Sequence, residues 1–257
     1  QPRSRGLGDV YKRQILGTVL GGFYTVLGGR LAEEDYHFFP YRCNHCKHKL
    51  SVLEVFPMIS YFILRGKCKH CGKKIDGMEP LMELFTGILF AVAYFSFGFS
   101  YELLIALGII SLLIIVTVSD LNYLIIPDEV LVFFILYFVV VQFFSLGAIG
   151  VVQHILTGIF LFVLMYAIMW LGEKLLKKES LGGGDVKMMF LFGLVLDPLL
   201  GTVAIFLGSL FALPMSLFLL YKNHEKMIPF GPFLLLALTF LYFTKITPDI
   251  LVQWIGL

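Results

Sequence analysis

Charge is scarce in this sequence. Only 15% of the 257 residues are Asp, Glu, Lys or Arg, whereas 58% are hydrophobic. Soluble domains carry about a quarter charged residues, so the composition excludes an ordinary soluble domain. The net charge of +2 is also far from the strongly basic balance of a nucleic-acid-binding protein. We therefore expect no nucleic-acid partner.

The basic start of the chain lacks the cleavage site of a secretory signal peptide. Residues 1–14 read QPRSRGLGDVYKRQ and end abruptly where an apolar segment begins at Ile15. No small-residue cleavage site follows that segment, so a signal peptide is not indicated. We expect residues 1–14 to be a non-native tail, and a native basic flank is the alternative.

Long apolar segments make up most of the remaining chain. Most run for about 17–25 residues, which is enough to cross about 30 Å of hydrocarbon. The pattern predicts an all-α polytopic membrane protein with about eight transmembrane helices. A first transmembrane helix is expected over 15–31, a polar insert over 32–80 and a transmembrane bundle over 81–257. Within the bundle the apolar segments are 81–98, 101–119, 129–147, 150–172, 186–197, 199–221 and 230–246.

The distribution of lysine and arginine orients the predicted bundle in the lipid bilayer. Cytoplasmic loops of membrane proteins collect Lys and Arg, which indicates that the insert 32–80 is cytoplasmic. Counting crossings from the insert places 119–129, 173–187 and 221–229 on the same side. Two of these loops carry lysines of their own, and the opposite loops near 98–101, 147–150 and 197–199 lack Lys and Arg. The lysines are Lys174, Lys177, Lys178, Lys187, Lys222 and Lys226.

The four cysteines of the chain all lie in the insert, as two C-x2-C pairs. Such pairs suit tetrahedral zinc, each pair supplying two thiolates, and a cytoplasmic loop disfavours stable disulfides. Four cysteine ligands leave no open coordination position, so the sequence predicts a structural zinc knuckle. Histidines of the insert as replacement ligands, or an iron–sulfur cluster, are alternatives. The predicted ligands are Cys43, Cys46, Cys68 and Cys71, and the histidines are His45, His48 and His70.

Two aspartates stand at the ends of apolar segments on the predicted cytoplasmic side. Asp120 ends the segment 101–119, and Asp185 begins the segment 186–197. A carboxylate in a membrane segment is energetically unfavourable and is a functional candidate by default. If the two meet, one stays protonated while the other is ionised. The ionised group would deprotonate an attacking water and the acid would assist the leaving group, which is aspartic proteolysis.

The residues around each aspartate also admit structural interpretations. Glycines 182–184 would allow unusual backbone angles and close approach of an extended substrate, or they form a flexible linker whose Asp185 caps the next helix. Asp120 has an alternative as an interfacial residue at a helix end. Asp128 follows Pro127 and is predicted to be a helix N-cap. Lys187 is expected to contact lipid headgroups, and the alternative is that it lowers the pKa of a neighbouring carboxylate.

Several motifs, in order, resemble the type IV prepilin peptidase family of aspartic proteases with a G-x-G-D motif. The paired cysteines are followed by FPMISYFILRGKC, by EPLMELFTG at 79–87 and SDLNYLIIPD at 119–128, then by GGGDVKMMFLFG at 182–193 and PFGPF at 229–233. The resemblance covers about 15–240. Two residues depart from the family's opening motif, Thr25 where asparagine is usual and Ala32 in place of proline.

The resemblance implies roles for specific residues. Asp120 and Asp185 would be the catalytic pair, and the four cysteines the zinc ligands. Family members are multi-pass proteins of the bacterial inner membrane, with the active site facing the cytoplasm. They cut the basic leader from prepilins or pseudopilins, typically after a glycine, and many then methylate the new amino terminus with S-adenosylmethionine. Glu83 lies in a matching motif, and no Rossmann-type glycine fingerprint is present.

Two rival functions use similar features. A presenilin-like intramembrane protease also has G-x-G-D, but its partner aspartate usually follows a tyrosine, whereas Asp120 follows Ser119. The zinc-knuckle insert is foreign to that group. A proton-coupled transporter would also need membrane carboxylates, but such proteins often show repeated halves, and these halves share no visible motif.

Overall fold

The protein is described from a computed structural model of the chain. The structure describes residues 17, 20–25, 27–29, 46, 67, 69–73, 78–177, 181–221 and 229–248. The predicted tail 1–14 and most of the insert 32–80 lie outside these residues. The chain divides into two compact units, Gln1–Gly98 and Phe99–Leu257, and each unit is described by itself.

In the first unit, helix α3 spans Met78–Phe97, and part of the predicted first transmembrane segment is helical. Gly17 and Gly21, one helical turn apart, face α3. A Cβ atom at Gly17 would lie 3.0 Å from the Cα of Gly87, and one at Gly21 would lie 2.9 Å from the Cα of Glu83. Small residues let transmembrane helices approach this closely, so the two glycines bring the first segment against α3.

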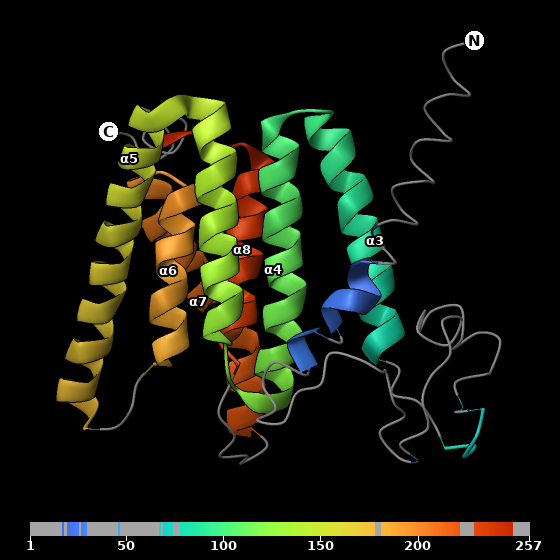
Figure 1. Ribbon diagram of the computed structural model, residues 1–257. Helices are drawn as coiled ribbons and strands as arrows, with labels where there is room; N and C mark the ends of the chain where they lie inside the picture. The colour runs from blue at the N-terminus through green and yellow to red at the C-terminus, as the bar shows by residue number, and fades with distance from the viewer. Residues whose placement is uncertain are drawn as a thin grey trace, which may run out of the picture. The chain divides into compact units, whose positions relative to one another are not determined.

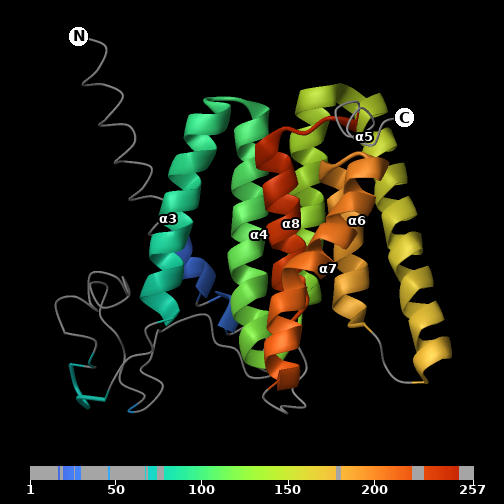
Figure 2. The same ribbon diagram turned by 180° about the vertical axis from the view of Figure 1, so that it is seen from behind.

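The second unit is a bundle of helices that stand side by side (Figures 1 and 2). Helix α8 packs against both α4 and α7, and α6 packs most closely against α5. Every regular element described in this unit is a helix, so the predicted all-α class is confirmed. The helices are α4 (Tyr101–Tyr123), α5 (Asp128–Leu176), α6 (Gly183–Val195), α7 (Pro198–Tyr221) and α8 (Gly231–Thr244).

Helix α5 consists of two arms joined at a kink. Gly147 has φ 74° and ψ −176°, which is not helical, and glycine adopts such angles because it has no Cβ atom. In Figure 1 the chain rises along the first arm, turns over at the kink and descends along the second. The two arms correspond to the predicted segments 129–147 and 150–172.

Four described helices are long and apolar enough to cross a membrane by length and composition. They lie at Pro80–Phe97, Tyr101–Tyr123, Asp128–Leu175 and Pro198–Leu219. At 1.5 Å per residue, the 13 residues of α6 and the 14 of α8 span only about 20 Å, less than the roughly 30 Å hydrocarbon core. The chain is a multi-pass membrane protein, but the described helices of sufficient length are fewer than the eight predicted.

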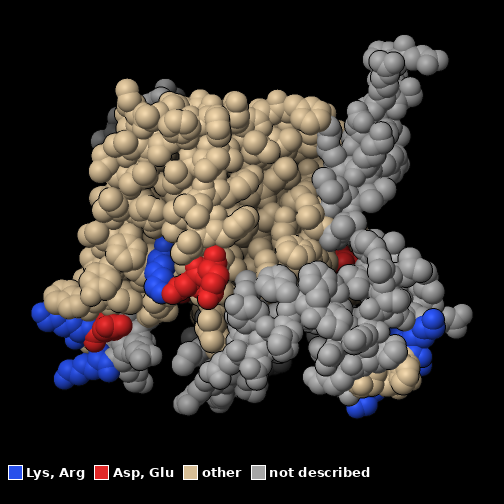
Figure 3. All heavy atoms as spheres, in the orientation of Figure 1, with Lys and Arg blue, Asp and Glu red and all other residues tan. Residues whose placement is uncertain are grey.

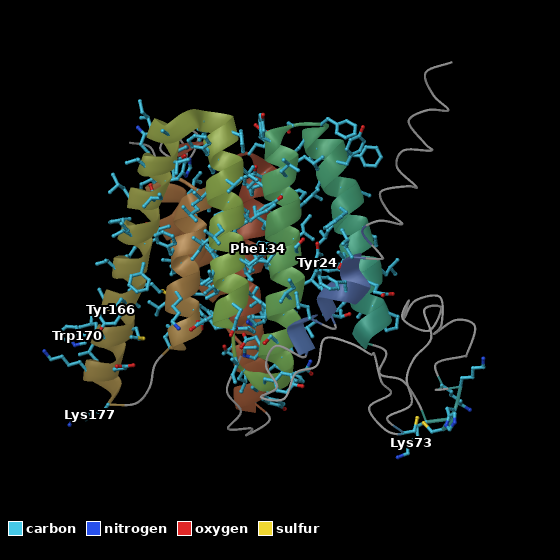
Figure 4. The ribbon with its side chains drawn as sticks, in the orientation of Figure 1. Tyr24, Lys73, Phe134, Tyr166, Trp170 and Lys177 are labelled. Carbon is cyan, nitrogen blue, oxygen red and sulfur yellow. The ribbon has the colours of Figure 1, made fainter. Side chains whose placement is uncertain are left out.

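Aromatic and basic side chains mark one end of the second unit. Tyr166 and Trp170 are about half exposed on the second arm of α5, and the Nζ atom of Lys174 lies 4.8 Å from the ring centroid of Trp170. Figure 4 shows Tyr166, Trp170 and Lys177 following one another toward the end of that arm. In Figure 3, the face of this unit that is turned to the viewer has its charged side chains, drawn in blue and red, at the same end. Tyrosine, tryptophan and lysine favour the membrane–water boundary, so this end lies at a membrane surface.

Helix α6 ends against polar side chains from both arms of α5. The last carbonyls of a helix have no partner within it, and hydrocarbon offers none. Gln142 Nε2 donates to the carbonyl oxygen of Leu194 at 2.9 Å, and His154 Nδ1 lies 3.2 Å from that of Gly193. These contacts let the short helix stop inside the bundle, and they fix its position along the bundle axis.

The backbones of α5 and α6 touch where two glycines meet. A Cβ atom at Gly193 would lie 2.2 Å from the backbone nitrogen of Gly158 and 2.3 Å from its Cα. No side chain can yield to relieve this overlap, because the neighbouring atoms belong to the backbone. The α5–α6 interface therefore requires glycine at 193.

We predict that Gly193→Ala lowers the free energy of unfolding by about 1–3 kcal/mol, as overpacking typically does. Unfolding of the purified protein in detergent micelles, followed by circular dichroism, measures the change. Gly183→Ala is the matched control, because a Cβ atom there would meet nothing within 4 Å. Equal stability of the two variants would contradict the backbone contact.

Candidate active site

The structure places the two predicted aspartates at the same end of the second unit. Asp120 lies in the last turn of α4 and Asp185 in the first turn of α6, and both helix ends are at the lower end in Figure 1. Their side chains are buried, with exposures of 6% and 7%. The Asp120 carboxylate is near enough to act electrostatically on Asp185. The site thus consists of two buried, interacting carboxyl groups.

Asp120 is held by the start of helix α8. The backbone N–H of Gly231 donates to Asp120 Oδ2 at 3.2 Å. The first N–H groups of a helix lack partners within it and carry partial positive charge, so this end of α8 suits a carboxylate. A Cβ atom at Gly231 would lie 3.1 Å from the same oxygen. Sequence reasoning assigned Gly231 no role, and only the PFGPF stretch pointed to it.

Asp185 has one carboxylate oxygen without a partner. Its Oδ1 atom is buried and accepts no hydrogen bond from the described residues. The N-cap of α6 is Gly182, which has no capping side chain of its own. The backbone N–H of Gly182 donates to the Asp185 carboxylate instead, so Asp185 does bond an amide at the start of the helix, as the capping alternative expected. A buried polar oxygen without a hydrogen bond is unfavourable and requires an explanation. A proton on the carboxyl group, or a hydrogen bond from a bound water or peptide, would explain the unpartnered oxygen.

The glycines before Asp185 permit close approach without unusual backbone angles. Gly182 has φ −70° and ψ 136°, and none of the described glycines from 182 to 184 has positive φ. A Cβ atom at Gly182 would lie 3.2 Å from Asp185 Oδ2, and one at Gly184 would lie 3.0 Å from Ile126 Cβ. Around Gly183 there is open space. The sequence suggested unusual backbone angles and close approach at these glycines. The structure shows the close approach.

The loop after α4 folds back against the turn that carries Asp120. Leu124 adopts the left-handed conformation with φ 57°, and its N–H donates to the carbonyl of Asp120 at 2.9 Å. The hydroxyl of the buried Ser119 donates to the carbonyl of Ile125 at 2.6 Å. These two bonds fix residues 124–127 beside the site.

An ion pair joins the start of α5 to α6. Lys187 Nζ donates to both carboxylate oxygens of Asp128, at 2.8 and 2.7 Å. Both side chains are more than half exposed, so the pair contributes at most about 1 kcal/mol. The N-cap of α5 is Pro127. The N-cap prediction for Asp128 is therefore wrong, and Lys187 contacts a neighbouring carboxylate, which was the alternative considered for it.

The predicted zinc site is described only in part. Cys46 and Cys71 are half-buried, whereas Cys43 and Cys68 lie outside the described residues. The zinc knuckle stays a prediction.

Glu83 and Thr86 are buried in α3, and the Thr86 hydroxyl donates to the carbonyl of Met82 at 2.7 Å.

Together these features define a multi-pass helical membrane protein with a buried pair of carboxyl groups at one membrane surface. Comparison with known families agrees with this class. Residues 15–97 match the bacterial Peptidase A24 N-terminal domain, and residues 107–217 match the type IV leader peptidase family. The chain belongs to the type IV leader peptidase family.

Three similar proteins share the name prepilin leader peptidase/N-methyltransferase. The protein of Bacillus subtilis strain 168 is 34% identical over 76% of this chain and 77% of its own length. The protein of Aeromonas hydrophila is 30% identical over 76% of this chain and 68% of its own length. The protein of Myxococcus xanthus strain DK1622 is 33% identical over 70% of this chain and 53% of its own length. No solved structure matches the chain.

We predict that Ser119→Ala loosens the loop beside Asp120. Loss of the hydrogen bond to Ile125 removes about 1 kcal/mol from the stability of the loop. This corresponds to about fivefold faster local opening. Amide hydrogen exchange at Leu124, followed by mass spectrometry, reports that opening. Ser111→Ala is the matched control in the same helix, because its hydroxyl bonds within α4 to Leu107. Equal exchange at Leu124 in both variants would show that Ser119 does not hold the loop.

Proposed function

We propose that this chain is a membrane aspartic endopeptidase that removes the basic leader from type IV prepilins or pseudopilins. The observation that carries the proposal is the pair of buried carboxyl groups, Asp120 and Asp185, at the membrane-surface end of the bundle. Family membership and the names of the relatives support prepilins as the substrate class.

The two carboxyl groups would share one proton and divide the roles of base and acid. Like charges this near each other do not both ionise readily in a buried site. The ionised carboxylate takes a proton from water as the water oxygen bonds to the scissile carbonyl carbon. The protonated carboxyl group donates a hydrogen bond to the carbonyl oxygen as negative charge develops there.

Collapse of the tetrahedral intermediate then completes hydrolysis. The carbon–nitrogen bond breaks, and the departing nitrogen takes the proton that the base removed from water. The leader leaves with a new carboxyl group, and the mature pilin keeps a new amino terminus. Water is the attacking group in this scheme, so no covalent intermediate forms on the protein.

The space beside the carboxyl groups suits an extended peptide. The surroundings of Gly183 are open, and the unpartnered Oδ1 of Asp185 is the polar atom that a reacting water or carbonyl would satisfy. Gly231 orients the second carboxylate through its N–H group. A leader with its scissile bond at the membrane surface would reach this end of the bundle while the following apolar helix stays in lipid.

We further propose eight crossings and a cytoplasmic site in a bacterial inner membrane. The count is reached when the two arms of α5 are taken separately and the segment 15–31 and the short helices α6 and α8 are included. The lysines near the end of the bundle that holds Asp120 and Asp185 support this orientation, because cytoplasmic loops collect basic residues. Among them Lys174, Lys177 and Lys187 are described, and the insert 32–80 would lie on the same side.

Methylation of the new amino terminus is the second activity that we propose. The names of the relatives include N-methyltransferase, and S-adenosylmethionine would supply the methyl group. The described residues identify no site for this cofactor, so we assign none.

The insert would hold a structural zinc ion through Cys43, Cys46, Cys68 and Cys71. Four thiolates in two C-x2-C pairs are a complete tetrahedral donor set, and their chemistry fits zinc. The ion would fold the insert and supply no open position for catalysis.

The two rival functions are less consistent with these findings. The family match extends over both the N-terminal domain and the peptidase region, and the three relatives bear the name prepilin leader peptidase/N-methyltransferase.

We predict that Asp120→Asn and Asp185→Asn each lower the rate of prepilin cleavage by at least about a thousandfold, because amides can neither take nor hold the shared proton. Mass spectrometry of a prepilin co-expressed with the chain measures the mature pilin and any added methyl group. Asp197→Asn is the control, since Asp197 is exposed at the other end of α6. Substantial cleavage by either active-site variant in folded protein would rule out the carboxyl pair.

We predict that the purified chain carries about one zinc ion, held by four cysteines. Metal analysis by inductively coupled plasma mass spectrometry measures the content, and Cys43→Ser with Cys68→Ser should abolish it. Proteolytic sensitivity of the insert should rise in that variant because zinc supplies folding energy to small metal-bound segments. Zinc-free wild-type protein with a protected insert would contradict the knuckle.

A further inference from the structure

One ion pair joins the two segments that carry the buried aspartates. Asp128 begins α5, directly after the loop that follows Asp120, and Lys187 lies in α6 just beyond Asp185. Lys187 Nζ is 2.8 and 2.7 Å from the two carboxylate oxygens of Asp128. The starts of α5 and α6 are both at the lower end of the bundle in Figure 1. The pair therefore links the segment after Asp120 to the helix that carries Asp185.

The first turn of α6 is weakly held by its own hydrogen bonds. The N–H groups of Asp185 and Val186 both donate to the carbonyl of Gly182, at 3.1 and 3.4 Å, and the second distance is longer than is usual for such a bond. The Gly182 N–H group bonds the Asp185 carboxylate, which is the group that would react. A Cβ atom at Gly183 would meet nothing within 4 Å. The turn that carries Asp185 therefore depends on contacts outside itself.

The segment on the other side of the ion pair is anchored to α4. The hydroxyl of the buried Ser119 bonds the carbonyl of Ile125, and Pro127, directly before Asp128, is buried. Asp128 is thus a fixed point relative to the last turn of α4. An ion pair from this point to Lys187 holds the start of α6 against the segment that follows α4.

The place of Lys187 in α6 is not explained by the helix itself. The helix dipole favours cations at the C-terminal end of a helix, whereas Lys187 is near the N-terminal end. Residues i and i+2 do not face each other on a helix, so Lys187 is not on the face that Asp185 presents to Asp120. Asp128, in contrast, lies in the first turn of α5, where negative charge is favourable. The lysine therefore acts through its contact with Asp128.

We propose that Asp128 and Lys187 are positioning residues that set the place of the Asp185 carboxyl group relative to Asp120. This inference rests on the proposed function and adds two residues that act through the start of α6. A small misplacement of a reacting group lowers the rate of the chemical step. An ion pair of modest strength at this place therefore changes kcat, whereas substrate binding is unaffected.

The first test is the kinetics of prepilin cleavage by the purified chain in detergent. Asp128→Asn and Lys187→Gln should each lower kcat by about fivefold, the most that an exposed ion pair usually supports, and should leave KM within about twofold of the wild type. The double variant Asp128→Lys with Lys187→Asp restores the pair with reversed polarity. Its kcat should return to within about twofold of the wild type, because the two substitutions are coupled.

The ion pair of Glu102 and Lys245 is the matched control. Its Nζ–Oε2 distance is 3.6 Å and both side chains are more than half exposed, but it joins the start of α4 to the end of α8, at the far end of α4 from Asp120. Glu102→Gln and Lys245→Gln should leave kcat within about twofold of the wild type. A loss of kcat as large as in Asp128→Asn would overturn the positioning role, because any exposed ion pair would then have the same effect.

A second measurement follows the start of α6 in the absence of substrate. Amide hydrogen exchange at Val186, read by mass spectrometry, should be about fivefold faster in Asp128→Asn than in the wild type and unchanged in Lys245→Gln. Equal exchange in the two variants would overturn the inference.

The remaining outcomes also decide the proposal. Wild-type kcat in the single variants overturns it, and so does a charge-reversed double variant as slow as the single ones, since the charge at 187 itself would then be required. Failure of the folded wild-type chain to cut any prepilin would instead overturn the proposed function. Exchange at Val186 still shows in that case whether the ion pair holds α6, so the two failures are distinguishable.

Discussion

The burial of two carboxyl groups at the end of an apolar bundle is the constraint on which the rest of the structure depends. Asp120 and Asp185 are each less than a tenth exposed, and burial of a charge is unfavourable unless hydrogen bonds or a proton compensate for it. The bundle supplies Asp120 with the N–H group of Gly231. It leaves Asp185 Oδ1 without a partner, so the pair is incompletely satisfied. That asymmetry is consistent with the proposed peptidase site, in which a water or a peptide carbonyl would satisfy the free oxygen.

The helices around the pair serve to hold it in register. Helix α6 is too short to span the hydrocarbon alone, and Gln142 and His154 from the two arms of α5 contact its final carbonyls. The touching backbones of Gly158 and Gly193 fix the same interface. Since α6 begins with the turn of Asp185, these distant contacts set the depth of that carboxyl group relative to Asp120. The short helix is therefore a positioning element of the site.

Sequence reasoning predicted the elements and could not predict the contacts between them. Hydropathy located each described helix to within a few residues, and motif order identified the family, because both are properties of local sequence. The kink at Gly147 lies at the junction of two predicted segments. Gly231 escaped functional assignment because its contact arises from a neighbour far away in the chain: Gly231 bonds a residue 111 positions away. Asp128 was assigned to a local cap, whereas its partner is Lys187, 59 positions on.

The most direct test of the shared proton is the pH dependence of prepilin cleavage by the purified wild-type chain. One ionised and one protonated carboxyl group are both required, so kcat/KM should rise and then fall with pH in a bell-shaped profile. Replacement of either carboxyl group should remove that profile along with the activity. A profile with a single limb across the stable pH range of the protein would contradict a cooperating pair.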